Sequence, residues 1–517
     1  MYRSRICRWV ILAAALLSFG IATGYFTWVE NHSAMGVRIL SREQRDAYNR
    51  YQYEDLSRFL EFNGEPAAVD VDSSTIYISQ DIGAGTQFAD LPGSLTVTHK
   101  DYTLRFAQDD RFSDLAAAVE EGHRFSLLAA KGTDSYMEYQ VVFTTLPVMR
   151  LDGYYSHINP ELREVMLGDV CLWAANDPTT GRYSVKTSTT EWHVRGGTTA
   201  SLAKKPWKLS LEKEYRKNNN VDFLGMGADD DWILNPMVVD DTKMKENLFM
   251  QLWNTLTEQS PWNHRMSTGE YVELVRNQSY EGVYLLQRRI DDKYLQLSEQ
   301  DILLKGGSSY APESLEVAYQ IQHSPLSEGD TFSLMEGFYT GEDTSVVNLE
   351  NFVDTNLFLH FAVAVDNMGY KNMFYLLEKE TDGYRLSLLP WDTDMSWGMI
   401  WINMNDTGGF FYDYDLSMGR MDVRQEYSSV RKQVPELDIL MAKRWQQLRQ
   451  GIMAEEYILA QVEQMSDRLR RSGVLHRDQQ RWGLYFDGDD TVQMLQQFLR
   501  ERLQLLDAEF GAVLQQS

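Results

Sequence analysis

The sequence predicts a mixed α+β protein with a helical C-terminal tail, preceded by a small all-β sandwich domain and an N-terminal transmembrane helix. The chain has 517 residues, more than one compact core usually holds. Hydrophobic residues make up 43% of it and aromatic residues 12%, so the chain has enough apolar surface to fold. Short β-rich runs come first, and stretches with apolar residues at helical spacing follow.

Charge and cysteine content exclude several classes of protein. Lys and Arg total 49 against 75 Asp and Glu, which gives a formal net charge of −26. We therefore expect no nucleic-acid partner, because binding a phosphate backbone requires a basic surface. The two cysteines, Cys7 and Cys171, form no CxxC motif, which excludes a disulfide framework and a thiolate zinc site. The sequence also lacks HExxH, GxSxG and P-loop motifs.

Residues 1–30 are predicted to be a membrane anchor. Three arginines within the first eight residues precede a charge-free run from Trp9 to Val29. About 20 apolar residues are enough to cross a bilayer core of about 30 Å, and flanking arginines stay in the cytoplasm. This predicts a single-pass protein of the cell membrane whose bulk is extracytoplasmic. The alternative is a signal segment cleaved near Ala22 or Gly24, which would make the protein secreted.

Four further units are expected along the chain. Residues 31–65 mix charge with apolar residues at near-helical spacing, which predicts a helical stalk. Residues 66–150 contain β-rich runs separated by Gly, Asp and Pro signals, which predict the all-β accessory domain. Residues 151–420 mix strand-like and helix-like runs and form the predicted main domain. Residues 421–517 are mostly helical and are expected to pack on it.

The first candidate site in the main domain is a glycine-containing loop followed by lysines. Its residues are Arg195, Gly196, Gly197, Thr198, Lys204, Lys205 and Lys208. Small residues with accessible backbone N–H groups beside a lysine-bearing strand can hold a polyphosphate. On composition alone, a polar hairpin with solvated lysines is the simpler interpretation.

The second candidate is the acidic run LGMGADDDW, residues 224–232. Three consecutive aspartates could bind a metal ion. Acidic runs are more often solvated turns and helix caps, so this run alone decides nothing.

The third candidate site gives the strongest signal. Asp366 follows an apolar helix, Asn372 comes six residues later, and Asp392 and Asp394 follow a predicted strand pair. Phosphoryl transfer uses this set: one Asp orients the acceptor hydroxyl, while an Asn and another Asp hold divalent cations. Paired carboxylates would also suit a glycoside hydrolase, and Asn and Asp also cap turns between strands.

Together these segments resemble the CotH kinase family, atypical protein kinases of the spore-coat type. The matching segments are RGGTTASLAKKPWKLSL (195–211), LGMGADDDWIL (224–234), DTKMKENL (241–248), YVELVRNQSYEGVYLL (271–286), DNMGYKNMFYL (366–376) and LLPWDTDMSWG (388–398). The resemblance covers roughly residues 151–419. It implies an atypical kinase-like fold that uses ATP with Mg²⁺ or Mn²⁺ to phosphorylate Ser or Thr of a protein.

The resemblance also implies roles for individual residues. Asp366 matches the catalytic aspartate that orients the acceptor hydroxyl. The residues expected to bind metal are Asn372, Asp392 and Asp394. The residues expected to bind ATP are Arg195, Gly196, Gly197, Thr198, Lys205 and Lys208. Among the lysines, Lys208 is the first choice for pairing with the phosphates, because it lies within a strand-like run.

Three positions depart from the family pattern. Gly197 stands where Asn or Ser is usual, Lys245-Glu246 where Arg-Asn is typical, and Arg288 where a glutamate is expected. The leading expectation is an extracytoplasmic kinase acting on a protein of the cell envelope or spore coat. The departures leave an alternative, a catalytically degenerate scaffold for envelope or spore-coat assembly.

Overall fold

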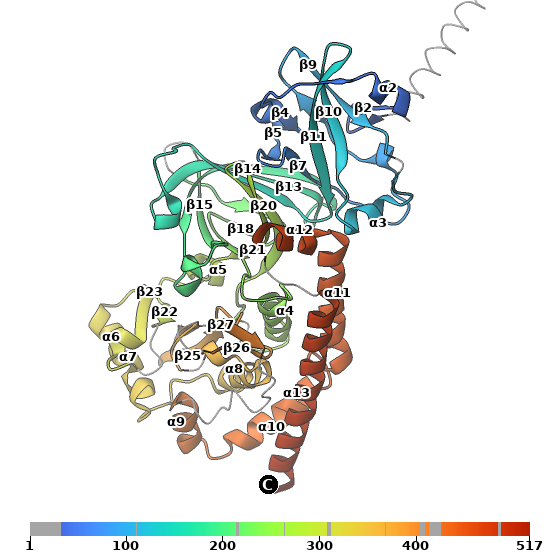
Figure 1. Ribbon diagram of the computed structural model, residues 1–517. Coiled ribbons are helices and arrows are strands. Elements are labelled where there is room, and N and C mark those ends of the chain that lie inside the picture. Colours follow the sequence, from blue (N-terminus) through green and yellow to red (C-terminus); the bar gives the residue numbers. More distant parts are fainter. Residues whose placement is uncertain are drawn as a thin grey trace, which may run out of the picture.

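The computed structural model describes residues 33–516 except residues 110, 214–216, 263, 308–311, 368, 403–408, 413–424 and 484–487. Figure 1 shows a β domain at one end, a β-barrel in the middle and a mixed region of helices and strands below it. Long C-terminal helices run along one side. The predicted α+β class and the helical C-terminal region are confirmed.

The predicted membrane anchor at residues 1–30 lies outside the described residues. Within the part of the chain that the structure describes, no helix combines the length and apolar character needed to cross a bilayer.

The β domain is built on an eight-stranded sheet in the order β1-β2-β9-β10-β11-β7-β6, with β3 paired to β11. Its strands are β1 (Ser33–Ala34), β2 (Val37–Leu40), β3 (Arg50–Tyr51), β6 (Ala68–Asp70), β7 (Thr75–Ser79), β9 (Tyr102–Ala107), β10 (Phe125–Lys131) and β11 (Ser135–Thr144). A smaller sheet contains β4 (Leu60–Phe62), β5 (Glu65–Pro66) and β8 (Leu95–Val97). Two short helices, α2 (Arg42–Asp46) and α3 (Leu115–Glu120), complete the domain.

The helical stalk expected at residues 31–65 is wrong. This segment supplies β1 to β4 of the two sheets, and its longest helix, α2, has five residues. Leu40, Leu56 and Leu60, whose spacing suggested a helix, are buried in the β domain. Their near-helical spacing arises because separate short strands and turns of the β domain each bury one or two of these residues.

The middle of the molecule is a closed barrel. Its strands follow the order β14-β13-β12-β20-β21-β19-β15, β15 pairs back onto β14, and β16 extends β15. They are β12 (Val148–Gly153), β13 (Met166–Asp177), β14 (Arg182–Val194), β15 (Trp207–Lys213), β16 (Lys217–Asn218), β19 (Asp231–Asn235), β20 (Gly269–Arg276) and β21 (Ser279–Arg288). Trp192, Trp207 and Trp232 belong to the core cluster that fills it. Successive side chains of a strand point to opposite faces of the sheet. Because Trp207 and Trp232 point into the barrel, their neighbours Lys208 and Asp231 lie on its outer face.

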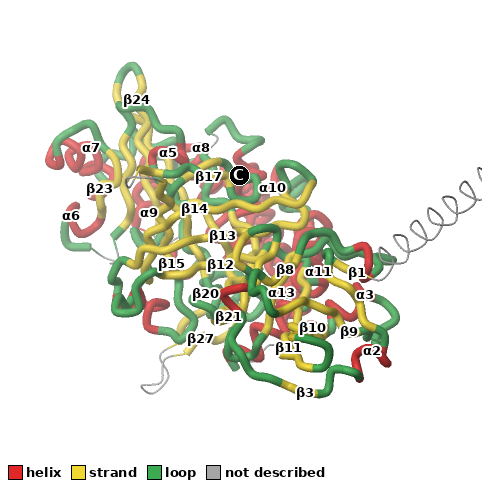
Figure 2. Tube along the Cα trace, turned by 90° about the horizontal axis from the view of Figure 1, so that it is seen from above, coloured by secondary structure: helices red, strands yellow, loops and turns green. Residues whose placement is uncertain are grey.

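The mixed region follows the barrel. Its sheet has the order β23-β22-β24-β25, formed by β22 (Ile302–Gly306), β23 (Tyr319–His323), β24 (Met373–Glu380) and β25 (Gly383–Pro390). Its helices are α4 (Lys245–Thr257), α5 (Asp292–Leu295), α6 (Leu315–Ala318), α7 (Glu328–Thr340) and α8 (Leu349–Ala362). Two smaller strand pairs are β17 (Val221–Asp222) with β18 (Ala228–Asp229), and β26 (Met399–Ile402) with β27 (Gly409–Tyr412). Figure 2 places α6 and α7 at the end of the molecule opposite the β domain.

The C-terminal region consists of α9 (Gln425–Gln433), α10 (Leu437–Leu448), α11 (Glu455–Arg471), α12 (Val474–Trp482) and α13 (Gly488–Gln516). The short helix α12 returns to the barrel and contacts β21 (Figure 1). Its Asp478 approaches Gly282 so closely that a Cβ there would lie 2.0 Å from the carboxylate. Gly282 also has a φ of +84°, so both space and backbone conformation require glycine.

Candidate active site

The hairpin of β24 and β25 brings three of the predicted site residues together. Met373 pairs with Pro390 at the open end of the hairpin, so Asn372 and Asp392 flank the same point. The Trp391 N–H donates a hydrogen bond to the Asn372 carbonyl oxygen at 2.9 Å, which extends the pairing by one step. Asp366 lies in the 3₁₀ turn Val365–Asn367 that follows α8.

Asp366 contacts two neighbours from the same segment. Lys371 Nζ lies 2.6 Å from Oδ1 and 2.7 Å from Oδ2 of Asp366. The Asn372 side-chain amide donates a hydrogen bond to Asp366 Oδ2 at 2.9 Å. The residue expected to orient the acceptor and the one expected to bind metal are therefore in direct contact.

A buried amide holds the backbone of this site. Asn367 Nδ2 donates hydrogen bonds to the carbonyl oxygens of Asn372 and Trp391, both at 2.8 Å. Asn372 and Asp392 each have a φ of 55°, a left-handed conformation that is strained for residues other than glycine. By joining the two loops, the Asn367 side chain stabilises both strained residues. Sequence reasoning did not select Asn367, although it lies next to Asp366.

The site brings several acidic side chains close together. Burial raises the pKa of Asp392, and the nearby Asp366 raises it further, against the opposite effect of Arg195. Burial also raises the pKa of Asp394 well above its ordinary value, and repulsion from Asp392 and Glu246 adds to this. Carboxylates crowded in this way are suited to a divalent cation, which would relieve their repulsion.

To hold one metal ion together, these carboxylates must be arranged around a single metal position. Among the described residues, no group of three His, Cys, Asp or Glu side chains is arranged to hold a metal ion. The donor set around Asn372, Asp392 and Asp394 fits Mg²⁺ or Mn²⁺ chemically, since both ions prefer oxygen ligands and usually complete their shell with water and phosphate.

Glu246, at the start of α4, joins this acidic group. Its carboxylate accepts hydrogen bonds from Asn235 on β19 and from Gln287 on β21. Burial and the charge of Asp392 raise the pKa of Glu246 to about 8, so this side chain is mainly protonated at neutral pH. The sequence marked Glu246 only as a departure from the family pattern, and its contact with the site depends on how α4 packs beneath the barrel.

Cationic side chains from three different elements oppose the carboxylates. Arg195 follows β14, and its guanidinium carbon lies 5.8 Å from the centre of the Trp391 ring. Burial lowers the pKa of Arg195, and the negative charge of Asp392 partly offsets this effect. Burial lowers the pKa of Lys305 on β22, and the charges of Arg195 and Arg289 lower it further. Arg289 and Lys305 are therefore part of the site, although no motif in the sequence indicated either.

The three lysines near residues 204–208 have different surroundings. Lys204 is fully buried, and its Nζ lies 2.6 Å from both Asp478 Oδ1 and the Val283 carbonyl oxygen. Lys205 Nζ donates a hydrogen bond to the Ala200 carbonyl oxygen at 3.0 Å. Lys208 Nζ lies 3.3 Å from Asp231 Oδ1 on the outer face of the barrel. Lys204 thus anchors α12, whereas Lys208 is on the side of the barrel that faces the mixed region.

The loop expected to face the phosphates lies between β14 and β15. Gly196 has a φ of +85°, and its carbonyl oxygen accepts a hydrogen bond from Arg163. Thr198 begins a 3₁₀ turn, Thr198–Ser201. A Cβ at Gly197 would meet no described atom within 4 Å, so the space around it does not explain why Gly replaces Asn or Ser.

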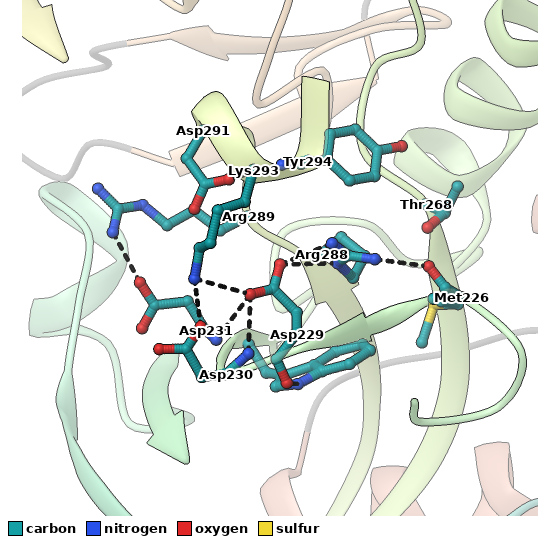
Figure 3. Close-up of polar contacts among 12 residues, drawn as sticks. Met226, Asp229, Asp230, Asp231, Thr268, Arg288, Arg289, Asp291, Lys293 and Tyr294 are labelled. Atoms are coloured by element: carbon teal, nitrogen blue, oxygen red, sulfur yellow. Dashed lines mark hydrogen bonds and ion pairs between the residues drawn. The ribbon is translucent and has the colours of Figure 1, made fainter. Parts of the chain in front are cut away.

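Arg288 is directed into the acidic loop before β19 (Figure 3). Its Nη2 and Nε lie 2.7 and 3.0 Å from Asp229 Oδ2, and its Nη1 donates to the Met226 carbonyl oxygen at 2.8 Å. Lys293 contacts Asp229 from the other side. The positive charge at position 288 is therefore neutralised by Asp229, and Arg288 serves the packing of this loop.

A comparison with known protein families gives a match. A family model described as CotH kinase protein matches residues 192–506, more than half of the chain. The matched part begins in β14 and ends in α13, so it includes the hairpin of β24 and β25 and the helices packed around it. A search of curated proteins found no match.

Proposed function

This chain belongs to the CotH kinase protein family, and we propose that it is a kinase that transfers the γ-phosphoryl group of ATP to a Ser or Thr side chain of a protein. The observation that carries the proposal is the grouping of these side chains. Asp366 and Asn372 are in contact beside Asp392, and the charges of Arg195 and Lys305 lower the pKa of Asp392. Phosphoryl transfer depends mainly on positioning and on neutralising phosphate charge, and this arrangement is suited to both.

The roles follow from chemistry and position. Asp366 is proposed to accept a hydrogen bond from the acceptor hydroxyl and so to orient it for attack. Asn372, Asp392 and Asp394 are proposed to hold Mg²⁺ or Mn²⁺, which would neutralise negative charge on the phosphates. The crowded carboxylates with raised pKa values support this assignment.

The cationic residues are proposed to bind the phosphates of ATP. Arg195 and Lys305 support this assignment because burial lowers the pKa of each, and a neighbouring arginine lowers it further: Arg289 for Arg195, and Arg195 and Arg289 for Lys305. A bound polyanion would offset this cost. Lys208 is proposed to contribute from the barrel. The loop of Gly196, Gly197 and Thr198 is proposed to cover the phosphates, while the bonded position of Lys205 on Ala200 favours a role in shaping that loop.

The substrate and the cellular location are part of the proposal. The charge-free run from Trp9 to Val29 supports an enzyme anchored in the cell membrane, or secreted after cleavage, that acts on a protein of the cell envelope or spore coat. The net charge of −26 argues against a nucleic-acid partner.

A second function, a non-catalytic scaffold, is favoured by one contact. Lys371 binds both carboxylate oxygens of Asp366, which competes with an acceptor hydroxyl. In a kinase this lysine must move to the transferring phosphate when ATP binds. In a scaffold it would keep Asp366 permanently ion-paired.

Nucleotide binding separates the two functions. The melting temperature of the purified full chain is measured with Mg·ATP, Mn·ATP, ATP with EDTA, and no ligand. A kinase is expected to be stabilised by metal and ATP together, by about 2.7 kcal/mol at 100 times the dissociation constant. Asp392→Asn should lose this stabilisation, while Asp382→Asn, in the exposed turn of the same hairpin, should keep it. A wild-type chain that is unaffected by Mg·ATP and Mn·ATP would support the scaffold.

A further inference from the structure

We propose that Asp231 is the positioning residue that holds Lys208 and Arg289 toward the phosphates of ATP, replacing the glutamate expected at position 288. This inference rests on the proposed kinase function. It assigns a specific task to the acidic run of residues 229–231, which the sequence alone left open between a metal site and a solvated turn.

Both oxygens of the Asp231 carboxylate are used. Oδ1 accepts a hydrogen bond from the Ser210 hydroxyl at 2.7 Å and lies 3.3 Å from Lys208 Nζ. Oδ2 lies 2.8 Å from Arg289 Nη1, a contact visible in Figure 3. Ser210 and Asp231 are cross-strand partners on β15 and β19, so the backbone of the barrel fixes the carboxylate. One carboxylate thus holds cations from two different segments.

The register of the barrel places this cluster toward the site. Lys208 pairs with Ile233, and Ile233 pairs with Gln287, so these three side chains form a row on the outer face. Ile233 packs in the same core as α4, and Gln287 binds Glu246 at the start of that helix. The outer face of β15, β19 and β21 therefore forms the side of the barrel next to the carboxylates of the mixed region.

Electrostatics connects Arg289 to the same place. The positive charge of Arg289 lowers the pKa values of both Arg195 and Lys305. The negative charge of Asp392 raises the same two pKa values. Two of the cations in this group, Arg195 and Lys305, have no ion pair among the described residues, whereas Arg289 and Lys208 are paired to Asp231. Asp231 therefore holds two of the four cations in this group, Lys208 and Arg289, in a fixed position.

Other carboxylates near the barrel have different partners. Asp229 binds Arg288 and Lys293, and Asp230 binds Lys293. Glu246 accepts hydrogen bonds from the neutral amides of Asn235 and Gln287. Among the described ion pairs, Asp231 is the carboxylate shared by Lys208 and Arg289.

Asp231 also has the charge that this task requires. Burial raises its pKa, but the hydrogen bond from Ser210 and the charges of Lys208 and Arg289 outweigh burial and leave the pKa below its ordinary value. The side chain is therefore ionised at neutral pH. In protein kinases a lysine that binds phosphates is oriented by a carboxylate in the same way, which reduces the conformational freedom lost on binding.

The test compares Asp231→Asn with Asp230→Asn in the full chain. Asp231→Asn keeps the size of the side chain and removes its charge, so it is expected to raise the KM for ATP at least tenfold. The affinity for adenosine, which has no phosphates, should stay within twofold of wild type. Asp230→Asn should leave the KM for ATP within twofold, because Asp230 binds Lys293 rather than Lys208 or Arg289. Asp231→Glu, which restores the charge, should recover part of the loss.

A double-mutant cycle distinguishes positioning from simple stabilisation of the fold. In a background with Lys208→Met and Arg289→Met, adding Asp231→Asn should change the KM for ATP by less than twofold, because the cations that it positions are gone. If Asp231→Asn does not fold, Ser210→Ala serves instead and should raise the KM two- to fivefold. An active wild type with an unchanged KM for ATP in the variants would overturn the inference and leave the kinase intact. A wild type that does not bind ATP would overturn both.

Discussion

Lys371 and Asp366 form a two-pronged contact at the centre of the candidate site, with Nζ 2.6 and 2.7 Å from the two carboxylate oxygens. They are five positions apart in the sequence, and Asn372, the residue after Lys371, also contacts Asp366. The ion pair keeps the ammonium group of Lys371 beside Asp366, the carboxylate that is proposed to orient the acceptor hydroxyl. When ATP binds, its γ-phosphate offers Lys371 a more highly charged partner, which leaves Asp366 to the acceptor hydroxyl.

Removing the charge of Asp366 should abolish transfer while leaving nucleotide binding. Asp366→Asn keeps the shape of the side chain but cannot accept the hydroxyl proton, and we expect kcat to fall by about 10²- to 10⁴-fold. The change in melting temperature with Mg·ATP should persist. Asp382→Asn is the matched control and should retain wild-type kcat. Equal activity of Asp366→Asn and wild type would assign the acceptor to another residue.

Asn367 is expected to control metal use through the backbone. Asn367→Ala removes both hydrogen bonds that hold the strained Asn372 and Asp392 loops, at a cost of about 1–3 kcal/mol in the free energy of unfolding. The concentration of Mg²⁺ or Mn²⁺ needed for half-maximal activity should rise at least fivefold. Asn351→Ala is the control, because this buried amide also makes two hydrogen bonds to backbone groups, the carbonyl oxygen and the N–H of Leu388 in β25. It should lose similar stability without changing the metal requirement, and the same metal shift in both variants would refute a specific role for Asn367.

Arg288 is expected to stabilise the fold without contributing to catalysis. Arg288→Met leaves the buried carboxylate of Asp229 with Lys293 and the backbone N–H groups of Asp230 and Asp231 on Oδ1, and with no described cation on Oδ2. The free energy of unfolding should therefore fall by about 3–5 kcal/mol. The KM for ATP of the folded fraction should stay within threefold of wild type. Arg289→Met should show the reverse, a loss of about 1 kcal/mol or less because its ion pair is partly exposed, with a raised KM. Urea unfolding and steady-state kinetics on the same samples measure both quantities.

The buried ion pair of Lys204 and Asp478 should anchor α12 to the barrel. Lys204→Met leaves Asp478 buried with only the Val283 N–H as a donor among the described contacts, and we expect a loss of about 3–5 kcal/mol in the free energy of unfolding. Replacing both residues, by Lys204→Met with Asp478→Asn, should lose less, because no uncompensated charge remains. A double variant as unstable as the single one would contradict this account.

The same lysine predicts a pH dependence. Burial lowers the pKa of Lys204 to about 8 from the ordinary 10.5. Between these two values the unfolded chain binds one proton more than the folded chain, so this group favours the folded state increasingly as pH rises. The difference in unfolding free energy between wild type and Lys204→Met should therefore widen from pH 8 to pH 10. Urea titrations at each pH measure it, and a constant or narrowing difference would show that Lys204 is not titrating there.

Local patterns in the sequence predicted part of the fold. The helical periodicity of the C-terminal region and the alternation of β-rich runs are properties of neighbouring residues, and the α+β class they predicted is confirmed. The prediction of a helical stalk was wrong because the near-helical spacing of Leu40, Leu56 and Leu60 has a non-local cause. Separate strands and turns of the β domain bury these residues. Closure of the barrel through β14 and β15 is likewise a long-range pairing that no local pattern reveals.

The candidate site divides in the same way. Asp366, Asn372 and Asp392 belong to one turn and one hairpin, and they were selected together from the sequence because their order fits phosphoryl transfer. Arg289 and Lys305 come from elements outside any recognised motif, and only the packing of the barrel against β22 brings them near Asp392. The sequence also could not show that Arg288 is directed toward Asp229, since this depends on the path of the loop before β19.

Transfer of labelled phosphate tests the central claim most directly. The full chain is incubated with γ-labelled ATP, Mg²⁺ or Mn²⁺ and a generic protein acceptor, beside Asp366→Asn and a sample with EDTA. The account predicts label on Ser or Thr of the acceptor in the wild-type sample alone, and none in the variant or with EDTA. Absence of label with both metals, together with a melting temperature that ATP does not change, would contradict the kinase and identify the protein as a scaffold.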